Sequence, residues 1–459
     1  MKEALDSYFM ALRGKRVAVL GIGVSNRPLI RLLLSYGLSV VACDKTPRAE
    51  LEDEVLALEA TGAELRVGPD YLENLTADVV FRTPGMHPEN PALVRLRQQG
   101  SRITSEMEAF FSLCPCDIIA VTGSDGKTTT TTLIAEILRQ AGRTVWVGGN
   151  IGQPLLDRIP EMTASDLAVV ELSSFQLMDM THSPKVAVVT NLAPNHLDVH
   201  KDMAEYIHAK EQIYLHQRPG DRLVLNYDNE ITRRFAEKAV GQVIYFSRQG
   251  QPSGGVWLEG DTIYAQGRAV MTRQDILLPG IHNVENYMAA ICAVAGYASD
   301  EDIRAVARSF GGVEHRIELV RELQGVRYYN DSIASSPTRT MAGLHSFDQQ
   351  VILIAGGYDK HISFAPLGPE IVQHVKRLIL CGATADKIRA AVLAAPDYAP
   401  GRPELTEVQT LAEAVTEAKN AAKPGDVVLL SPACAAFDQF KNFMVRGQTF
   451  KTLVRDLKE

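Results

Sequence analysis

The stretch VTGSDGKTTTTTLIAEIL, residues 121–138, joins a strand, a glycine loop and a helix. The apolar run DIIAV that leads into it is typical of a buried strand, and the apolar residues after the loop recur at helical spacing. Glycines let the backbone approach an anion, and a helix N-terminus presents free N–H groups with partial positive charge. The stretch therefore predicts a phosphate-binding loop between a buried strand and a helix.

The loop departs from the common pattern for nucleotide-binding loops. GxxxxGK[ST] requires a glycine where this chain has Val121. Lys127 still follows the second glycine and can neutralise the outer phosphates of a nucleotide, while Thr128 or Thr129 can offer a hydroxyl to Mg²⁺. β-Branched threonines are mediocre helix formers, but they suit a first turn that needs hydroxyls. The alternative is a strand-to-helix turn with an exposed lysine.

Length and composition are those of a globular protein with several domains. The chain has 459 residues, of which 46% are hydrophobic and 22% are charged. A chain of this length is too long to fold around one ordinary hydrophobic core. Its net charge of −8, from 47 basic and 55 acidic residues, argues against a general nucleic-acid or membrane-surface binder. We expect no secretory signal and no membrane span, because no run approaches about 18 apolar residues. The scattered cysteines, with one CPC pair at Cys114 and Cys116, indicate the reducing cytoplasm.

Short apolar runs alternate with helical stretches along almost the whole chain. This alternation predicts an α/β protein with parallel sheets, in which ligands bind at the carboxyl ends of the strands. We divide the chain into three blocks, residues 1–110, 111–312 and 313–459. Within the second block, residues 254–278 have short alternating strands and no helix pattern, which predicts a small antiparallel insertion.

The first block opens like a dinucleotide-binding fold. A strand, the glycine turn GIGVSN, a helix and a second strand follow one another, and Asp44 stands 23 residues after Gly21. The fingerprint is incomplete because Asn26 occupies the place of the third glycine. A nicotinamide-dependent oxidoreductase is thus one alternative function.

Charged residues follow two strands of the second block. Glu171 ends the run LAVVE, and His196 follows KVAVVTNL, as does Asp198. A carboxylate among apolar residues is costly unless it is paired or bound to metal, so Glu171 fits a Mg²⁺ ligand. Glu171 could instead accept hydrogen bonds from loop amides, and His196 could be an ordinary loop histidine. Their shared position beside the phosphate loop favours a metal site, whereas spacing alone favours an exposed helix lysine at Lys210.

The third block has further polar residues at strand ends. Arg316, Asp331, Lys360 and the loop SPACAAFD at 431–438 are candidates for a second ligand face.

Together these runs resemble the ATP-dependent Mur ligases over essentially the whole chain. The matching motifs are TGSDGKTT, GGNIG (148–152), ELSSFQL (171–177), NHLD (195–198), HNVEN (282–286), HRIE (315–318), NDSIASSP (330–337) and SPACAAFDQFKNF (431–443). The phosphate loop, NHLD and the later HR are shared with sister ligases and with folylpolyglutamate synthase. ELSSFQL, NDS and the SPACAAFD run resemble the family member that adds D-glutamate. The resemblance implies a Rossmann-like N-terminal domain, a central mononucleotide-binding parallel-sheet domain with the insertion, and a Rossmann-like C-terminal domain.

The implied reaction is the joining of two small molecules in peptidoglycan precursor synthesis. ATP would phosphorylate the carboxylate of UDP-N-acetylmuramoyl-L-alanine (UDP-MurNAc-L-Ala), and the amine of D-glutamate would attack the acyl phosphate. We expect a cytoplasmic monomer that binds no nucleic acid and inserts into no membrane. The alternatives are a sister Mur ligase or folylpolyglutamate-type ligase with another amino-acid acceptor, and a non-catalytic uridine-nucleotide sensor.

The resemblance also assigns residues. The residues expected at ATP are Gly123, Ser124, Asp125, Gly126, Lys127, Thr128, Thr129, Asn283, Arg316 and Asp331. The ligands expected at two Mg²⁺ ions are Thr128, Glu171, His196 and a carbamylated Lys210. The residues expected at the UDP-sugar are Ser25, Asp44, Thr46, Gly85 and Asn150, and those expected at D-glutamate are Lys360, Phe437 and Phe443. The expected catalytic set is Lys127, Glu171, His196 and Lys210.

The resemblance implies that Lys210 corresponds to the family lysine that CO₂ converts from a cation into an anion able to bind metal. An unmodified ammonium would repel the Mg²⁺ that it faces.

The chain departs from the family pattern at two places. Ile333 replaces a lysine, with Ser335 and Ser336 in the places of threonine and asparagine, and Ala436 replaces a serine that helps to hold D-glutamate. We therefore expect Lys360 and backbone N–H groups to carry more of the carboxylate binding.

Overall fold

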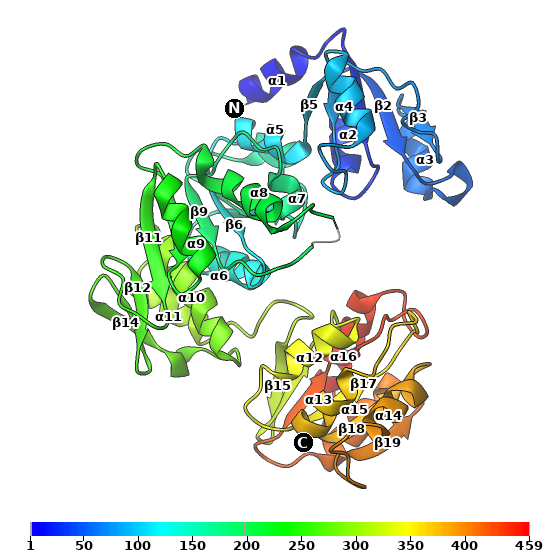
Figure 1. The fold of residues 1–459 in the computed structure, drawn as a ribbon, viewed down its shortest axis with the longest axis vertical. Coiled ribbons are helices and arrows are strands. Elements are labelled where there is room, and N and C mark those ends of the chain that lie inside the picture. The colour runs from blue at the N-terminus through cyan, green and yellow to red at the C-terminus, as the bar shows by residue number, and fades with distance from the viewer. Residues whose placement is uncertain (1, 197–198, 459) are drawn as a thin grey trace. The chain divides into compact units, whose positions relative to one another are not determined.

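The structure is a computed structural model that describes residues 2–196 and 199–458. The chain forms two compact units. Unit 1 contains Met1–Arg273 and Glu285–Val306, and unit 2 contains Gln274–Val284 and Ala307–Glu459 (Figure 1). Leu197 and Asp198, the last two residues of the NHLD motif, lie outside the described residues.

The first sheet of unit 1 is wholly parallel, with strand order β3-β2-β1-β4-β5. Its strands are β1 (Arg16–Leu20), β2 (Ser39–Asp44), β3 (Glu64–Val67), β4 (Val79–Phe81) and β5 (Arg102–Thr104). The accompanying helices are α1 (Lys2–Met10), α2 (Asn26–Ser35), α3 (Asp53–Ala60), α4 (Pro91–Gln98) and α5 (Glu106–Leu113). β1 and β4 are almost fully buried, as expected of strands covered by helices on both faces.

The second sheet of unit 1 has the order β14-β13-β12-β11-β10-β9-β6-β8-β7. Its strands are β6 (Asp117–Thr122), β7 (Val145–Gly149), β8 (Leu167–Glu171), β9 (Val186–Val189), β10 (Arg222–Asn226), β11 (Gln242–Ser247), β12 (Val256–Glu259), β13 (Thr262–Ala265) and β14 (Arg268–Thr272). The pairs are parallel except β12–β13 and β13–β14, so the antiparallel insertion predicted over 254–278 is present. The main helices are α6 (Lys127–Gln140), α7 (Ser174–Leu177), α8 (Met203–Leu215), α9 (Glu230–Arg234), α10 (Ile281–Val294) and α11 (Asp300–Ala307).

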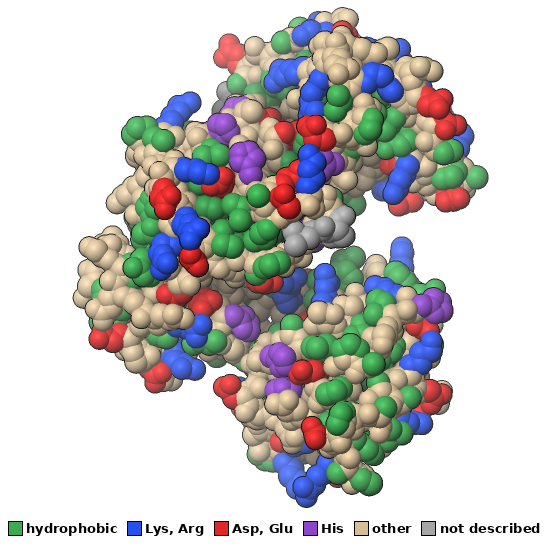
Figure 2. Space-filling view, viewed as in Figure 1, with side chains coloured by type: hydrophobic (Ala, Val, Ile, Leu, Met, Phe, Trp, Pro, Cys, Tyr) green, Lys and Arg blue, Asp and Glu red, His purple; other side chains and the backbone are tan. Residues whose placement is uncertain are grey.

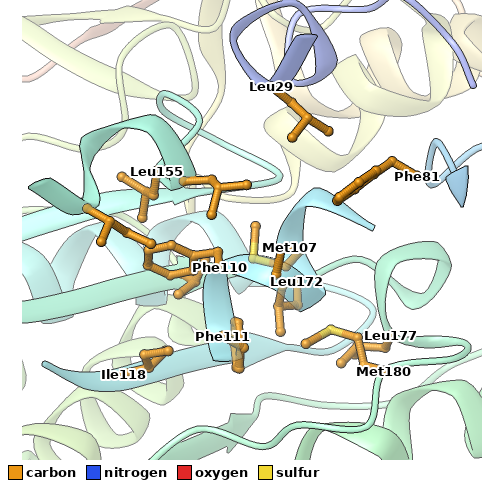
Figure 3. Packing of buried hydrophobic residues seen from close by; sticks show 14 of the residues in the cluster. Leu29, Phe81, Met107, Phe110, Phe111, Ile118, Leu155, Leu172, Leu177 and Met180 are labelled. Carbon is orange, nitrogen blue, oxygen red and sulfur yellow. The ribbon is translucent and has the colours of Figure 1, made fainter. Parts of the chain in front are cut away.

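One hydrophobic core runs through both sheets of unit 1. Figure 3 shows Met107 and Phe110 of α5 beside Leu155 and Leu172, all of them buried. Burying a large apolar side chain contributes about 1.5–3 kcal/mol, so α5 is held firmly where the chain passes from one sheet to the next.

Unit 2 contains a third sheet, of order β15-β16-β20-β17-β18-β19, in which only β15–β16 is antiparallel. Its strands are β15 (Glu318–Leu323), β16 (Val326–Asn330), β17 (Val351–Ala355), β18 (Val375–Cys381), β19 (Glu404–Val408) and β20 (Val427–Leu430). Its helices are α12 (Pro337–Leu344), α13 (Leu367–His374), α14 (Ala385–Leu393), α15 (Leu411–Ala421) and α16 (Phe443–Arg455). The predicted α/β architecture with parallel sheets is confirmed.

The surface mixes both signs of charge, as Figure 2 shows for one face. Across the described part of the chain, no helix combines the length and the apolar character needed to cross a bilayer. All six cysteines are free thiols.

Candidate active site

The phosphate loop connects the end of β6 to the start of α6, as the sequence predicts. Gly123 has a φ of 145° and Gly126, at the N-cap of α6, has a φ of 76°. A Cβ atom on Gly123 would lie 2.0 Å from the Thr190 hydroxyl oxygen, and one on Gly126 would lie 2.3 Å from the Asn286 side-chain oxygen. Both glycines are therefore required by crowding as well as by backbone conformation.

The loop is fastened to the chain that follows β9. The N–H groups of Ser124 and Asp125 donate to the backbone and side-chain oxygens of Asn191, at 2.9 and 3.0 Å. The Ser124 hydroxyl lies 3.0 Å from the hydroxyl of Tyr206 on α8. Because these contacts fix the loop from two sides, its remaining N–H groups are held ready for an anion.

Lys127 and the threonines begin α6. The Lys127 ammonium donates to the Ser124 carbonyl at 2.8 Å, so the side chain folds back over the loop. Thr128 and Thr129 are half-buried, whereas Thr130 and Thr131 are fully buried. Thr132 is half-buried as well, but its hydroxyl donates to the Thr128 carbonyl at 2.8 Å, so Thr128 and Thr129 are the threonines best placed to offer a hydroxyl to a phosphate or metal.

Glu171 ends β8, directly beside the loop. β6 lies between β8 and β9, and Val121 pairs with Glu171 across the sheet. The Glu171 side chain is 1% exposed, and its Oε1 accepts a hydrogen bond from the Asn150 amide at 2.8 Å. Among the described residues, its buried Oε2 atom has no hydrogen-bond partner. An unpaired buried carboxylate oxygen is costly, so the site fits a cation.

Lys210, on α8, is buried next to the same loop. Its ammonium nitrogen donates to the Thr122 hydroxyl at 2.9 Å and to the Gly123 carbonyl at 3.0 Å. Within the described part of the chain, no carboxylate forms an ion pair with it. Burial, reinforced by the nearby charge of Lys127 and opposed by Glu171, holds the pKa of Lys210 well below its usual value. The prediction from spacing alone, that Lys210 is an exposed helix lysine, is wrong because this position of α8 faces the core.

His196 occupies the loop after β9, with a φ of 56° and an exposed side chain. Its ring stands edge-on to Phe175, with 5.2 Å between the ring centroids. Phe175 belongs to α7, whose ELSSFQL sequence forms a reciprocal cap: Ser173 accepts from the Gln176 N–H, and the Gln176 side chain accepts from the Ser173 N–H. The motif therefore fixes the surface against which His196 rests.

His200 is a buried residue beside Phe175 that sequence reasoning missed. It is buried, lies 2.9 Å from the Ser174 hydroxyl and stacks on Phe175 at a centroid distance of 5.3 Å. Burial lowers its pKa below the usual histidine value, against the pull of Glu205. Its spacing of four residues from His196 is the only sequence signal, and one such spacing is weak.

The carboxyl edge of the first sheet carries four of the five residues expected at the UDP-sugar. Asp44 accepts from the N–H groups of Ile22 and Thr46, at 2.7 and 2.9 Å. Burial raises the pKa of Asp44, but these hydrogen bonds outweigh it and hold the pKa below the usual value. Ser25, at the N-cap of α2, and Gly85 are exposed at the same edge. The fifth residue, Asn150, orients Glu171 in the second sheet.

Two residues explain how this edge is shaped. Asn26, in place of the third glycine, is buried and donates to the carbonyls of Leu20 and Gly21, which closes the turn. Arg82, 1% exposed, forms an ion pair with Asp179 and donates to the Phe175 carbonyl at 3.0 Å. Sequence reasoning missed Arg82, although a buried arginine at a strand end couples the two sheets of unit 1.

Asn283, Arg316 and Asp331 belong to unit 2. Asp331 follows β16, is buried, and accepts from the Ser431 hydroxyl at 2.7 Å. Burial raises its pKa to about 7, against the hydrogen bond from Ser431 and the charge of Arg316. Arg316 is exposed, and Asn283 donates to the Pro279 carbonyl at 2.6 Å.

Three loops of unit 2 meet at the carboxyl ends of β16, β20 and β17. Arg446 of α16 is buried and joins two of them, because its guanidinium donates to Ser332 and to the carbonyls of Cys434 and Ala435. Burial lowers the pKa of Arg446 to about 10. Sequence reasoning missed this residue as well, since nothing near it in the sequence marks the contact.

The residues expected at D-glutamate lie on these loops or at their ends. Lys360 is exposed and reaches the Ser335 carbonyl at 3.4 Å. Phe437 is 63% exposed and stands edge-on to Tyr358, while Phe443, at the start of α16, stands edge-on to His315. The structure thus brings the third-block loops together, with Lys360 and Phe437 exposed and Phe443 half-buried.

Comparisons with known proteins match the phosphate-loop region and the third block to two domains of one family. Residues 121–294 match the Mur ligase middle domain, and residues 315–434 match the Mur ligase glutamate ligase domain. The chain is 50% identical to the UDP-N-acetylmuramoylalanine--D-glutamate ligase of Clostridium novyi, with both chains fully covered. It is also 50% identical to the enzyme of the same name from Acetivibrio thermocellus, again over the whole of both chains.

Solved structures show the same fold at low identity. The UDP-N-acetylmuramate-alanine ligase of Thermotoga maritima matches with a TM-score of 0.57 and 19% identity, covering 97% of this chain and 100% of that one. A UDP-N-acetylmuramoyl-L-alanyl-D-glutamate--2,6-diaminopimelate ligase matches with a TM-score of 0.57 and 18% identity, covering 96% of this chain and 93% of that one. The chain belongs to the Mur ligase family, and within it to the UDP-N-acetylmuramoylalanine--D-glutamate ligases.

Proposed function

We propose that this chain adds D-glutamate to UDP-MurNAc-L-Ala at the expense of ATP, in peptidoglycan precursor synthesis. Relatives that share half of its residues over their full length have this activity in their names. The observation in the structure that carries the proposal is the group formed by the phosphate loop and the buried side chains of Glu171 and Lys210. Such a group suits transfer of a phosphoryl group, which depends on positioning and on neutralised charge.

The proposed reaction has two steps. A carboxylate oxygen of UDP-MurNAc-L-Ala attacks the γ-phosphorus of ATP, the bond to ADP breaks, and an acyl phosphate forms. The neutral amine of D-glutamate then attacks the acyl carbon, phosphate leaves, the amine loses a proton, and the amide bond remains. In this proposal the phosphate loop from Gly123 to Thr129 holds the ATP phosphates, and the Lys127 ammonium neutralises charge on the outer phosphates.

Metal binding is proposed at Glu171, His196 and the Thr128 hydroxyl, with two Mg²⁺ ions in all. The unpartnered Glu171 Oε2 and the oxygen-rich donor set fit this hard cation. When bound, Mg²⁺ would offset negative charge on the phosphates. Asn150 donates a hydrogen bond to Glu171 Oε1, which fixes the carboxylate and orients Oε2 for the metal.

Lys210 is proposed to carry a carbamate. Its nitrogen is buried, donates only to neutral oxygens, and lacks a carboxylate partner among the described residues, so it favours the neutral amine. A neutral amine can attack CO₂, losing a proton and forming an N–CO₂⁻ group. That anion would supply further oxygens for the metal, where an ammonium would repel it.

The remaining residues are proposed to bind the three substrates. Asn283, Arg316 and Asp331 would contact the nucleotide. The residues proposed at the UDP-sugar are Ser25, Asp44, Thr46, Gly85 and Asn150, and those proposed at D-glutamate are Lys360, Phe437 and Phe443. We further propose that the enzyme works as a monomer in the cytoplasm; its six free thiols support a reducing compartment.

An amino-acid panel tests the proposal. Phosphate release from ATP is measured with UDP-MurNAc-L-Ala and, in turn, D-glutamate, L-glutamate, L-alanine and a diamino acid. We expect release only when D-glutamate and UDP-MurNAc-L-Ala are both present. Equal rates with L-glutamate, or with a folate in place of the UDP-sugar, would contradict the assignment.

A further inference from the structure

We propose that unit 2 carries a surface site for a transition-metal ion of the Zn²⁺ class, formed by His345, Glu370 and His374. Each of the three offers one ligand atom, and these atoms all lie within 4.8 Å of one another. The site is independent of the activity proposed above, because none of its residues belongs to the phosphate loop or to the loops assigned to substrates.

Two helices bring the ligands together. Glu370 and His374 are four residues apart on α13, which places them on one face of the helix. His345 is the C-cap residue of α12, and α12 packs against α13 (Figure 1). The neighbouring residues Leu344 and Ile371 are fully buried, so the core fixes both helices while the ligands face outward.

The distances are close to those of a bound metal. Glu370 Oε2 lies 3.6 Å from His374 Nε2 and 2.5 Å from His345 Nε2, and the two imidazole centroids are 5.0 Å apart. Ligands about 2.0–2.2 Å from a tetrahedral Zn²⁺ are separated by roughly 3.3–3.6 Å. The His374–Glu370 pair already meets this, and the His345–Glu370 hydrogen bond would open by about 1 Å as the metal replaces its proton.

The charged residues around Glu370 leave its carboxylate available to a metal ion. Throughout the described residues, its only ion-pair partners are the two histidines, and no lysine or arginine competes for the carboxylate. The side chains are 53%, 24% and 23% exposed for His345, Glu370 and His374. An ion can therefore enter from solvent, and water can complete its coordination.

The donor set selects the class of metal. Two imidazole nitrogens and one carboxylate oxygen match zinc sites that keep an open position, and imidazole also suits Ni²⁺ and Cu²⁺. Mg²⁺ and Ca²⁺ prefer sites in which most ligands are oxygen atoms, whereas two of the three ligands here are imidazole nitrogens, so millimolar Mg²⁺ should not displace the ion.

The site would join α13 to α12, a helix that begins at a loop carrying a residue proposed at the nucleotide. α12 begins at Pro337, immediately after the NDSIASS loop that holds Asp331 and Ser332. A metal that joins the C-terminal end of α12 to α13 would restrain this helix, because an ion that binds only the folded arrangement stabilises it.

Zinc binding to the full-length, untagged chain tests the proposal. Zn²⁺ is titrated against a chromophoric chelator in excess Mg²⁺, which keeps the phosphate-loop site occupied by Mg²⁺. We expect one tight Zn²⁺ per wild-type chain. His345→Ala and His374→Ala should each weaken Zn²⁺ binding by more than about 100-fold. Loss of a residue that only hydrogen-bonds to a metal ligand would weaken binding by about 10–100-fold.

The matched control is His182→Ala, which removes an exposed histidine that also pairs with a glutamate, Glu108, but has no second histidine in the pair. It should bind Zn²⁺ like wild type. Equal Zn²⁺ affinity in wild type, His345→Ala and His374→Ala would overturn the proposal.

Two measurements on the wild-type chain do not depend on the variants. X-ray absorption of the Zn²⁺-loaded protein should report two imidazole ligands, and amide hydrogen exchange of residues 337–345 should slow when Zn²⁺ is added. Coordination without imidazole, or exchange that Zn²⁺ leaves unchanged, would contradict the site.

Discussion

The phosphate-loop region of unit 1 and the loops of unit 2 that carry Lys360 and Phe437 differ in how far their side chains are buried and hydrogen-bonded within the chain. Glu171 and Lys210 are almost completely buried and held by specific hydrogen bonds. Lys360 and Phe437 are exposed, and Lys360 has one long contact to a carbonyl. Charges in a desolvated site act strongly on a bound phosphate, whereas exposed ones are screened. We therefore expect changes in the first region to reduce kcat and changes in the second to raise KM.

The largest effect is expected for Lys127→Ala. Removing the charge that faces the outer phosphates should lower kcat by about 10³-fold or more. Binding of the UDP-sugar, measured by calorimetry, should stay close to wild type because four of its five proposed residues lie on the other sheet of unit 1. Lys185→Ala, at an exposed lysine paired with Asp221, is the control and should be fully active. Substantial turnover by Lys127→Ala would refute the loop assignment.

Lys210→Ala should also be nearly inactive, but for a different reason. If the role of Lys210 is to supply an anion, short carboxylic acids such as acetate should restore part of the activity. Lys201→Ala, at an exposed lysine just before α8, should be unaffected. Failure of rescue, combined with no additional carbamate mass on wild-type Lys210, would count against the modification.

A pair of glycine variants separates crowding from backbone strain. Gly126 and Gly142 have φ values of 76° and 74°, but an added Cβ meets Asn286 at the first and nothing within 4 Å at the second. Both variants should lose about 1–2 kcal/mol of unfolding free energy from the left-handed conformation. Only Gly126→Ala should also lower kcat/KM for ATP, by about 10–100-fold through the displaced loop. Similar kinetics in both variants would show that the loop tolerates the displacement.

In unit 2 the effect is expected on KM and not on kcat. Lys360→Ala removes one charged hydrogen bond to D-glutamate, worth about 1.5–3 kcal/mol, so KM for D-glutamate should rise by about 10–100-fold with kcat nearly unchanged. Lys376→Ala, whose ammonium pairs with Asp426, is the control. A fall in kcat with unchanged KM would place Lys360 in the chemistry instead, and the contrast between the two regions would fail.

The sequence predicts the fold well because its strands are continuous apolar runs that end in polar residues. β6, β8 and β9 fall where these runs stand, and the loop, Glu171 and the chain after β9 meet as the carboxyl ends of neighbouring strands must. Lys210 could not be placed by spacing, since a helix alone does not reveal which face is buried. Only the resemblance to Mur ligases assigned it a role.

Other residues were missed because their contacts join distant parts of the chain. Arg82 reaches Asp179, and Arg446 reaches Ser332, across separations that no local pattern encodes. Asn26 departs from the glycine fingerprint, and the structure gives the reason: its amide closes the turn. Long-range polar contacts of this kind carry no periodicity, so sequence reasoning could not predict them.

Isotope labelling of the carboxylate oxygens tests most directly whether the γ-phosphoryl group is transferred to the alanine carboxylate. UDP-MurNAc-L-Ala labelled with ¹⁸O in its alanine carboxylate is converted with ATP and D-glutamate, and the products are analysed by mass spectrometry. If the phosphate loop directs the γ-phosphoryl group to that carboxylate, one ¹⁸O should appear in the released phosphate, with ADP as the nucleotide product. Unlabelled phosphate, or ¹⁸O in AMP, would contradict the account.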